Sequence, residues 1–339
     1  MKRTVFTVLQ FAFFLVIGLI LLYYAFRGVT FEELVNSLAI ADFKWVAFAL
    51  CFALIGYISR AYRWKLLIKP LNHDPSLQNV FYALMIGYTA NFAFPRIGEI
   101  TRCGTLRRSD NIPVDSLLGT VIIERAIDLV VLLFILFLVF FSKIGFFGAF
   151  FSKNIFNPFI DQLNATLKMG FVNWIIAVVA VIVLVILIRF FNIRFSRSPV
   201  IKKIKELIRG VVMGLKTISK MEDRWTFVFL TLIIWLMYFL MTYVLVFAFT
   251  ATAHLGPLDG LFLLVIGGMG MSAPVQGGIG AFHWIVSLGL SLYGVSKADA
   301  VAYATLSHES QSIFAILLGA FSFIMLLVQK SKAKIAHKS

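Results

Sequence analysis

The sequence predicts an all-α polytopic membrane protein with about six full spans and two re-entrant hairpins of broken helix. Hydrophobic residues make up 60% of the 339 positions, the mean hydropathy is +0.93, and only 14% of the residues are charged. A soluble domain has about a quarter of its residues charged. In addition, the basic residues gather between the apolar runs, and two of the runs are interrupted by proline. These three observations together favour a bundle of membrane helices.

The expected spans are apolar runs of about twenty residues, the length that crosses a bilayer as a helix. In chain order they are 5–26, 43–62, 117–141, 171–191, 225–249 and 298–328. The first run resembles a signal peptide, but its apolar stretch is about 22 residues long and no A-x-A site follows, so we interpret it as a retained helix. The segment FEELVNSLAIADF after it is interpreted as an interfacial half-helix.

The two interrupted runs resemble each other. MIGYTANFAFPRIGE surrounds Pro95, and VIGGMGMSAPVQGGIG surrounds Pro274, about 180 residues later. Proline cannot donate a backbone hydrogen bond and the nearby glycines relax the backbone, so each run is expected to turn there. We predict repeat units at 43–141 and 225–328 within a single membrane domain, 1–339. The alternative is that any two glycine-bearing apolar segments look alike.

The charge distribution predicts the orientation. If both hairpins are re-entrant and the N-terminus is cytoplasmic, 24 of the 31 Lys and Arg residues lie inside and 6 lie outside, with Arg125 within a span. Such a bias indicates cytoplasmic termini in a cell (inner) membrane protein. An odd number of crossings between Pro95 and Pro274 then makes the repeat an inverted one, as in many secondary transporters.

The net charge of +15 is expected to serve contacts with anionic lipid rather than nucleic acid. The stretch 194–224 is basic, with apolar residues at helical spacing. It predicts a cytoplasmic amphipathic helix on the membrane surface. Arg60 and Arg63, at the predicted end of the second span, are expected to extend to the inner headgroups.

The first break carries a charged group. Arg96, Glu99 and Arg102 follow Pro95 at three-residue spacing, which places them on one face of a helix. Charges at membrane depth are costly, so they normally face a protein interior or a wet cavity. Two arginines with a carboxylate between them suit a phosphate headgroup. The alternative is a cytoplasmic loop with ordinary positive charge.

The next span carries a second charged group, Glu124, Arg125 and Asp128. Glu124 and Asp128 are one turn apart on a helix, while Arg125 points about 100° away. The two carboxylates either take a proton or balance the arginines of the hairpin. The alternative is a structural ion pair, for example between Glu124 and Arg96 or Arg102.

The second break has glycines where the first has charges. The run PVQGGIGAFHW can present backbone N–H groups to an anion, and His283, His308 and Glu309 are the strongly polar side chains nearby. Each histidine is alternatively a hydrogen-bonded packing residue. No metal-ligand spacing and no nucleophile–base pair stands out, and Cys51 and Cys103 suggest no disulfide. We therefore predict no metal, no cofactor and no enzymatic activity.

Four sequence elements resemble the flippase-like integral membrane family typified by the membrane region of lysylphosphatidylglycerol synthase, the multiple peptide resistance factor. They are RAYRWKLLI, GYTANFAFPRIGEITR, the ER-x-x-D of residues 124–128 and the late PVQGGIG, and the similarity covers about 60–327. The resemblance carries site roles to these residues: Asn91, Pro95, Arg96, Gly98, Glu99, Arg102, Glu124, Arg125 and Asp128. Together with the second break, the expected substrate-binding set also includes Gln276, Gly277, Gly278, Gly280, His283, His308 and Glu309.

The resemblance implies a protein that moves phospholipids or lipid-linked headgroups between leaflets, with membrane lipids as its partners. One departure concerns the late motif, where the family commonly has a carboxylate and this chain has His283. The alternative function is an accessory, or a membrane part, of a lipid-modifying transferase. Only eleven residues follow Val328, so the soluble domain that transfers lysine from tRNA is not expected in this chain.

Overall fold

The computed structural model describes residues 2–95, 97–145, 157, 160–161, 219 and 221–336, and in this part the chain is helical without strands. Five of the six predicted spans fall on helices. The sixth, 171–191, lies outside the described residues, as do Arg96 and nearly all of the basic stretch 194–224. The chain divides into two compact units, Met1–Arg125 with Thr217–Ser339, and Ala126–Lys216.

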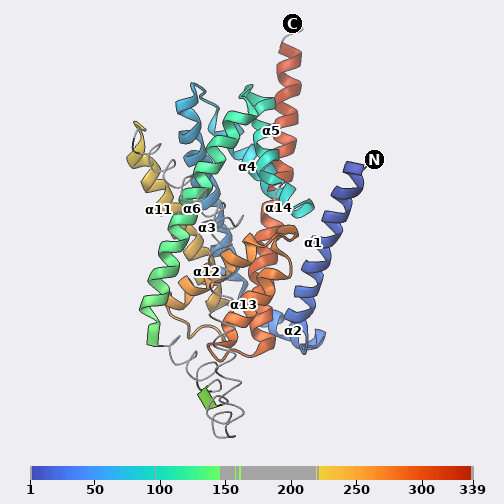
Figure 1. The fold of residues 1–339 in the computed structure, drawn as a ribbon, viewed down its shortest axis with the longest axis vertical. Coiled ribbons are helices and arrows are strands. Elements are labelled where there is room, and N and C mark those ends of the chain that lie inside the picture. Colours follow the sequence, from blue (N-terminus) through green and yellow to red (C-terminus); the bar gives the residue numbers. More distant parts are fainter. Residues whose placement is uncertain are drawn as a thin grey trace, which may run out of the picture. The chain divides into compact units, whose positions relative to one another are not determined.

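The first unit begins with a bent pair of helices. Helix α1 (Lys2–Phe26) is followed by α2 (Phe31–Ala39) at an angle of 77° (Figure 1). A capping box starts α2: the Glu33 N–H donates to Thr30 Oγ1 (3.2 Å), and the Thr30 N–H donates to Glu33 Oε2 (2.7 Å). The predicted half-helix is therefore a real helix, and its interfacial position stays a prediction.

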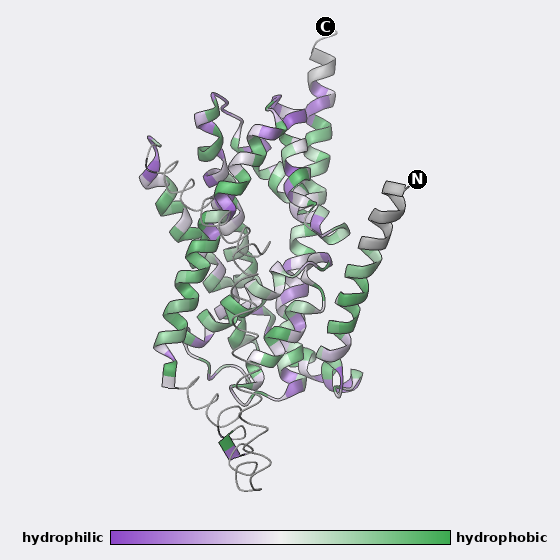
Figure 2. Ribbon diagram, in the orientation of Figure 1, coloured by the Kyte–Doolittle hydropathy of each residue, from purple (hydrophilic) through white to green (hydrophobic). Residues whose placement is uncertain are grey.

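Among the described residues, three helices are long and apolar enough to cross a membrane: α3 (Phe43–Ile68), α11 (Arg224–Tyr243) and α14 (Lys297–Ala336). The bent pair α1–α2 makes a fourth if it counts as one span. Figure 2 shows how hydrophobic α1 and α11 are over most of their described length. A short 3₁₀ turn, Val244–Ala248, extends α11. The described part thus supports three to four of the predicted spans.

The first predicted break is a helical hairpin made of α4 (Leu77–Ala93) and α5 (Gly98–Asp110). The Asn79 amide donates to the Asp110 carboxylate (3.1 Å) at the open end. Near the tip, a methyl group added to Gly87 would lie 2.8 Å from the Gly98 carbonyl oxygen. The two helices therefore run antiparallel and touch backbone to backbone where they approach the break.

The second predicted break is a hairpin of the same form. Helix α12 (Pro257–Ser272) leads into a 3₁₀ turn, Gln276–Gly278, and then α13 (Ala281–Ser291). A methyl group added to Gly270 would lie 2.8 Å from the Cα of Phe282, so these helices also meet closely near their turn. At the open end, the rings of Phe262 and Tyr293 are 5.8 Å apart.

Helix α14 lies along both hairpins (Figure 1). Tyr82 of α4 contacts Phe321 of α14, and Thr89, nearer the hairpin tip, contacts Ala315. Helix α4 is therefore antiparallel to α14. The tip of the second hairpin reaches α14 at His308, whose Nε2 lies 2.8 Å from the Gly277 carbonyl oxygen.

The two hairpins therefore approach the middle of α14 from opposite ends, and their tips meet there. A methyl group added to Gly277 would collide with the Phe92 ring, which places the turn of the second hairpin against the last turn of α4.

The second unit contains the later part of α6 (Val114–Ser142), which starts in the first unit. This helix matches the predicted span 117–141. Its described residues in the second unit are mainly apolar and aromatic, and the rings of Phe137 and Phe141 lie 4.2 Å apart.

Candidate functional site

A fully buried carboxylate is the centre of the first hairpin's polar group. Glu124 of α6 has 0% of its surface exposed. Its Oε1 accepts hydrogen bonds from Nε and Nη2 of Arg60 (2.9 and 2.7 Å), and its Oε2 accepts one from Arg102 Nη2 (2.9 Å). The Arg63 Nη2 lies 3.7 Å from Oε1. One acid thus joins three arginines that come from α3 and α5.

The arginines are held by further contacts to α11. Arg60 Nη1 donates to the Tyr238 hydroxyl (2.7 Å), and Arg63 Nη1 donates to Thr231 Oγ1 (3.3 Å). Because each guanidinium carries five donors in a fixed fork, one group can bridge several helices. The cluster therefore ties α3, α5, α6 and α11 together through charge-assisted bonds.

Aromatic rings also pack against the arginines of this cluster. The Arg102 guanidinium lies over the Trp64 ring at 4.4 Å, and Arg60 lies over the Tyr88 ring at 5.7 Å. The Trp64 Nε1–H donates to Thr120 Oγ1 (2.9 Å), which fixes that ring. Cation–π contacts strengthen where water is excluded, and Trp64 is fully buried.

The expected position of Arg60 and Arg63 in the inner headgroups is wrong. They are 6% and 0% exposed, because α3 does not end near Tyr62 but continues to Ile68. The spacing RAYR puts both guanidinium groups on one helical face, and that face meets Glu124 64 residues further along the chain. Their helical spacing within an otherwise apolar run is the signal that could have identified them.

Other predicted site residues of the first hairpin have separate positions. Glu99 pairs with Arg125 (2.6 Å), and the Arg125 side chain is about half exposed. Asn91 accepts a hydrogen bond from the Gly98 N–H (2.7 Å), which closes the turn around Pro95. Asp128 belongs to the second unit, so its role beside Glu124 stays a prediction, as does that of Arg96 outside the described residues.

The second tip brings the other predicted residues together. Gly277, Gly278 and Gly280 have φ values of 56°, 80° and 80°, a region that favours glycine because it has no Cβ. Gln276 donates through Nε2 to the Phe11 carbonyl oxygen of α1 (3.3 Å).

Beside these glycines lie the three polar side chains that the sequence singled out. His308 Nδ1 is 3.0 Å from Glu309 Oε1, and His283 Nε2 is 3.6 Å from the same oxygen. The tip therefore presents imidazole nitrogens and a carboxylate together, whereas the N–H groups expected to bind an anion remain a prediction.

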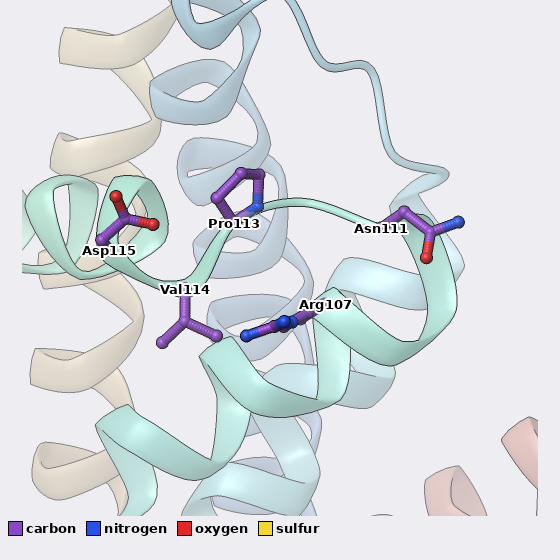
Figure 3. A pocket seen from close by; sticks show the side chains of 5 residues that line it. All are labelled: Arg107, Asn111, Pro113, Val114 and Asp115. Carbon is purple, nitrogen blue, oxygen red and sulfur yellow. The ribbon is translucent and has the colours of Figure 1, made fainter.

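An open pocket of about 590 Å³ lies elsewhere, at the connection between α5 and α6. Figure 3 shows the Arg107 side chain beside Val114, with Pro113 on the connection and Asp115 in the first turn of α6. None of the predicted site residues lines it. It is near the open end of the first hairpin, where Asp110 holds the start of α4.

Comparison with known proteins agrees with the helical, membrane-type composition. The chain is 26% identical over 136 residues to a UPF0104 membrane protein of Methanocaldococcus jannaschii. The aligned region covers 39% of this chain and 38% of that protein. No solved structure matches significantly. The family described as "Lysylphosphatidylglycerol synthase TM region" matches residues 9–319. This match covers the bent pair, both hairpins and the buried arginine cluster, and the chain therefore belongs to the lysylphosphatidylglycerol synthase TM region family.

Proposed function

We propose that this chain is a flippase-type transporter that moves a phospholipid or a lipid-linked headgroup between the leaflets of the cell membrane. The two hairpin tips that meet in the middle of α14 support the proposal, because broken helices that meet at mid-membrane form the substrate sites of many secondary transporters. In this proposal the hairpins are re-entrant loops of an inverted repeat, at 43–141 and 225–328. Both termini then lie in the cytoplasm, in keeping with the bias of basic residues.

The observation that carries the proposal is the pair of spare buried donors on Arg102, beside the first tip. Arg102 is 2% exposed and donates through Nη2 to Glu124. Its Nε and Nη1 are also buried, and they make no hydrogen bond among the described residues. A phosphate group is a strong acceptor for such guanidinium donors.

The cluster is adjacent to the place where the tips meet. Tyr88, whose ring lies beneath Arg60, is one helical turn before Phe92, which contacts Gly277. A lipid headgroup drawn to the arginines would thus lie beside the tips, while its acyl chains remain in the bilayer. We propose anionic phospholipids, or headgroups linked to a lipid carrier by phosphate, as the substrate class.

Reconstitution into vesicles tests this proposal. Fluorescently labelled phosphatidylglycerol should exchange between leaflets faster than in protein-free vesicles, and Arg102→Gln should abolish most of the difference. Arg107→Gln is the matched control, since Arg107 is on the same helix α5 and is exposed. Exchange no faster than in protein-free vesicles, across several anionic lipids, would contradict the proposal.

An accessory role in lipid modification is the second candidate, favoured by the family to which the chain belongs. In that role the protein would present or accept a lipid for a transferase encoded separately, and we propose that the chain is not itself the enzyme. Incubation with phosphatidylglycerol and lysyl-tRNA tests this point. We expect no lysylated lipid by mass spectrometry, and its formation by the purified chain would contradict the non-enzymatic role.

A further inference from the structure

The tip of the second hairpin gathers a set of potential metal ligands from two helices. His283 comes from α13, and His308 and Glu309 come from α14. One ligand atom from each of the three lies within 4.8 Å of the others. Both imidazoles are buried, whereas the Glu309 side chain is 45% exposed. The group is therefore enclosed on the imidazole side and open on the carboxylate side.

The hydrogen bond of His308 to the backbone determines what faces Glu309. The Gly277 carbonyl oxygen, 2.8 Å from His308 Nε2, can only accept, so Nε2 carries a proton. Nδ1 is then the nitrogen that can bind a second cation, either a proton or a metal ion. That nitrogen lies 3.0 Å from Glu309 Oε1, itself an acceptor. At this distance the nitrogen and the oxygen share one cation, which is a proton or a metal ion that both can bind.

His283 adds a second imidazole to the same carboxylate oxygen. Its Nε2 lies 3.6 Å from Glu309 Oε1, and its ring centroid is 4.9 Å from that of His308. The Nδ1 of His283 is buried with no hydrogen-bond partner among the described residues. Two nitrogens therefore converge with one oxygen, while the rings of Phe26 and Phe282 pack around the His283 imidazole.

We propose that His283, His308 and Glu309 bind a transition-metal dication of the Zn²⁺ type. Zinc binds imidazole nitrogen and carboxylate oxygen at about 2.0–2.2 Å, which puts the ligands of a tetrahedral site about 3.3 Å apart. The observed separations of 3.0 and 3.6 Å bracket that value. Hard cations such as Mg²⁺ and Ca²⁺ prefer oxygen ligands, so two imidazoles select against them.

The surroundings of His308 match those of a metal-binding histidine. Such residues usually donate their second ring N–H to a carbonyl or carboxylate, which orients the ring, and Gly277 provides that carbonyl to His308. The exposed side of Glu309 offers an entry route and leaves a fourth position for water. A bound ion would join α13 to α14 and hold the turn of the second hairpin in place.

Metal titration of the detergent-solubilised full-length protein tests the proposal independently of lipid transport. The protein carries a purification tag without histidine, is stripped of metal, and is titrated with Co²⁺ and, separately, with Zn²⁺. We expect one Zn²⁺ per chain by elemental analysis. Bound Co²⁺ should show visible d–d absorption. The X-ray absorption spectrum of the bound metal should show two imidazole nitrogens among its ligands. His283→Ala and Glu309→Gln should weaken the affinity at least tenfold.

The matched control is His254→Ala, because His254 is exposed and lies outside the group. It should bind metal as the unaltered protein does. Absence of stoichiometric binding by the unaltered protein would overturn the proposal and leave a proton as the shared cation. Unchanged affinity in both ligand variants would also overturn it. If a variant aggregates on gel filtration, the X-ray absorption spectrum of the unaltered protein decides the ligand set.

Discussion

The two hairpins reach the same geometry by different chemistry. In both, two antiparallel helices touch at glycine and turn at a proline-containing break. The first turn is closed by a side chain, since Asn91 accepts the Gly98 N–H. The second is closed by glycines at positive φ and by His308, which binds the Gly277 carbonyl. One backbone arrangement therefore serves two kinds of polar site.

The difference suits the two tips to ligands of opposite charge. Beside the first, Arg102 has two buried N–H donors without a hydrogen-bond partner among the described residues, which suits an anion. Beside the second, imidazole lone pairs and a carboxylate converge, which suits a cation. Under the proposed transport function, the two tips would correspond to the substrate and coupling-ion positions that secondary transporters place between broken helices. The mutations below test whether the two hairpins differ in this way.

Replacing Glu124 with glutamine has the largest expected effect. The change keeps the shape of the side chain but removes the carboxylate charge that three buried arginines contact. Breaking a buried ion pair by removing one partner costs about 3–5 kcal/mol. The free energy of unfolding in detergent should fall by that amount. A loss below about 1 kcal/mol would mean that the arginines are not held by this carboxylate.

Gly98→Ala is expected to be the next most damaging change, and it acts on the first hairpin alone. The new methyl group would lie 2.6 Å from Asn91 Nδ2 and would also meet the Gly87 carbonyl. Overpacking of this kind costs about 1–3 kcal/mol. Gly104→Ala is the control on the same helix, since nothing lies within 4 Å. Thermal unfolding of both variants should separate them, and equal stabilities would contradict the close backbone contact.

Gly278→Ala tests the second hairpin. Its φ of 80° is unfavourable for alanine by about 1–2 kcal/mol, and the methyl group would lie 2.7 Å from Met271 Sδ. Gly294 has a similar φ of 77° with nothing within 4 Å. Gly294→Ala therefore measures backbone strain alone. Chemical denaturation should show the larger loss for Gly278→Ala, and the reverse order would argue against a tightly packed turn.

Arg125→Gln has the smallest expected effect on stability. Its partner is Glu99, and the Arg125 side chain is 48% exposed, so the pair contributes about 0–1 kcal/mol. Leaflet exchange should persist, in contrast to Arg102→Gln. A complete loss of exchange with unchanged stability would instead support the sequence-based prediction that Arg125 binds substrate.

Periodicity and breaks predicted the helices better than the contacts. Pro95 and Pro274 located both turns, and the apolar runs located α1, α3, α6, α11 and α14. The predicted positions of Arg60 and Arg63 were wrong because the predicted span was ended where the charged residues begin. The helix itself continues past them to Ile68. What keeps them in the interior is Glu124 on another helix, and no spacing within one helix reveals a partner 64 residues away.

The same limitation explains the second tip. His308 and Glu309 are neighbours in sequence, but His283 belongs to another helix, and the three meet only because the hairpin folds back against α14. The sequence therefore showed three polar residues but not that they could bind one ligand together. Arrangements made by long-range packing are set by tertiary contacts, which local propensity and pattern do not encode.

Helix α14 is a single uninterrupted rod of 40 residues that supports both tips. The Ala315 carbonyl oxygen accepts a hydrogen bond from the Thr89 hydroxyl, and His308 contacts the Gly277 carbonyl oxygen. At 1.5 Å per residue, these two attachment points on α14 are about 10 Å apart along the helix axis. A rod does not stretch between them. Any sliding or twisting of α14 must therefore displace both attachments together, so the positions of the two hairpin tips are coupled through one rigid helix.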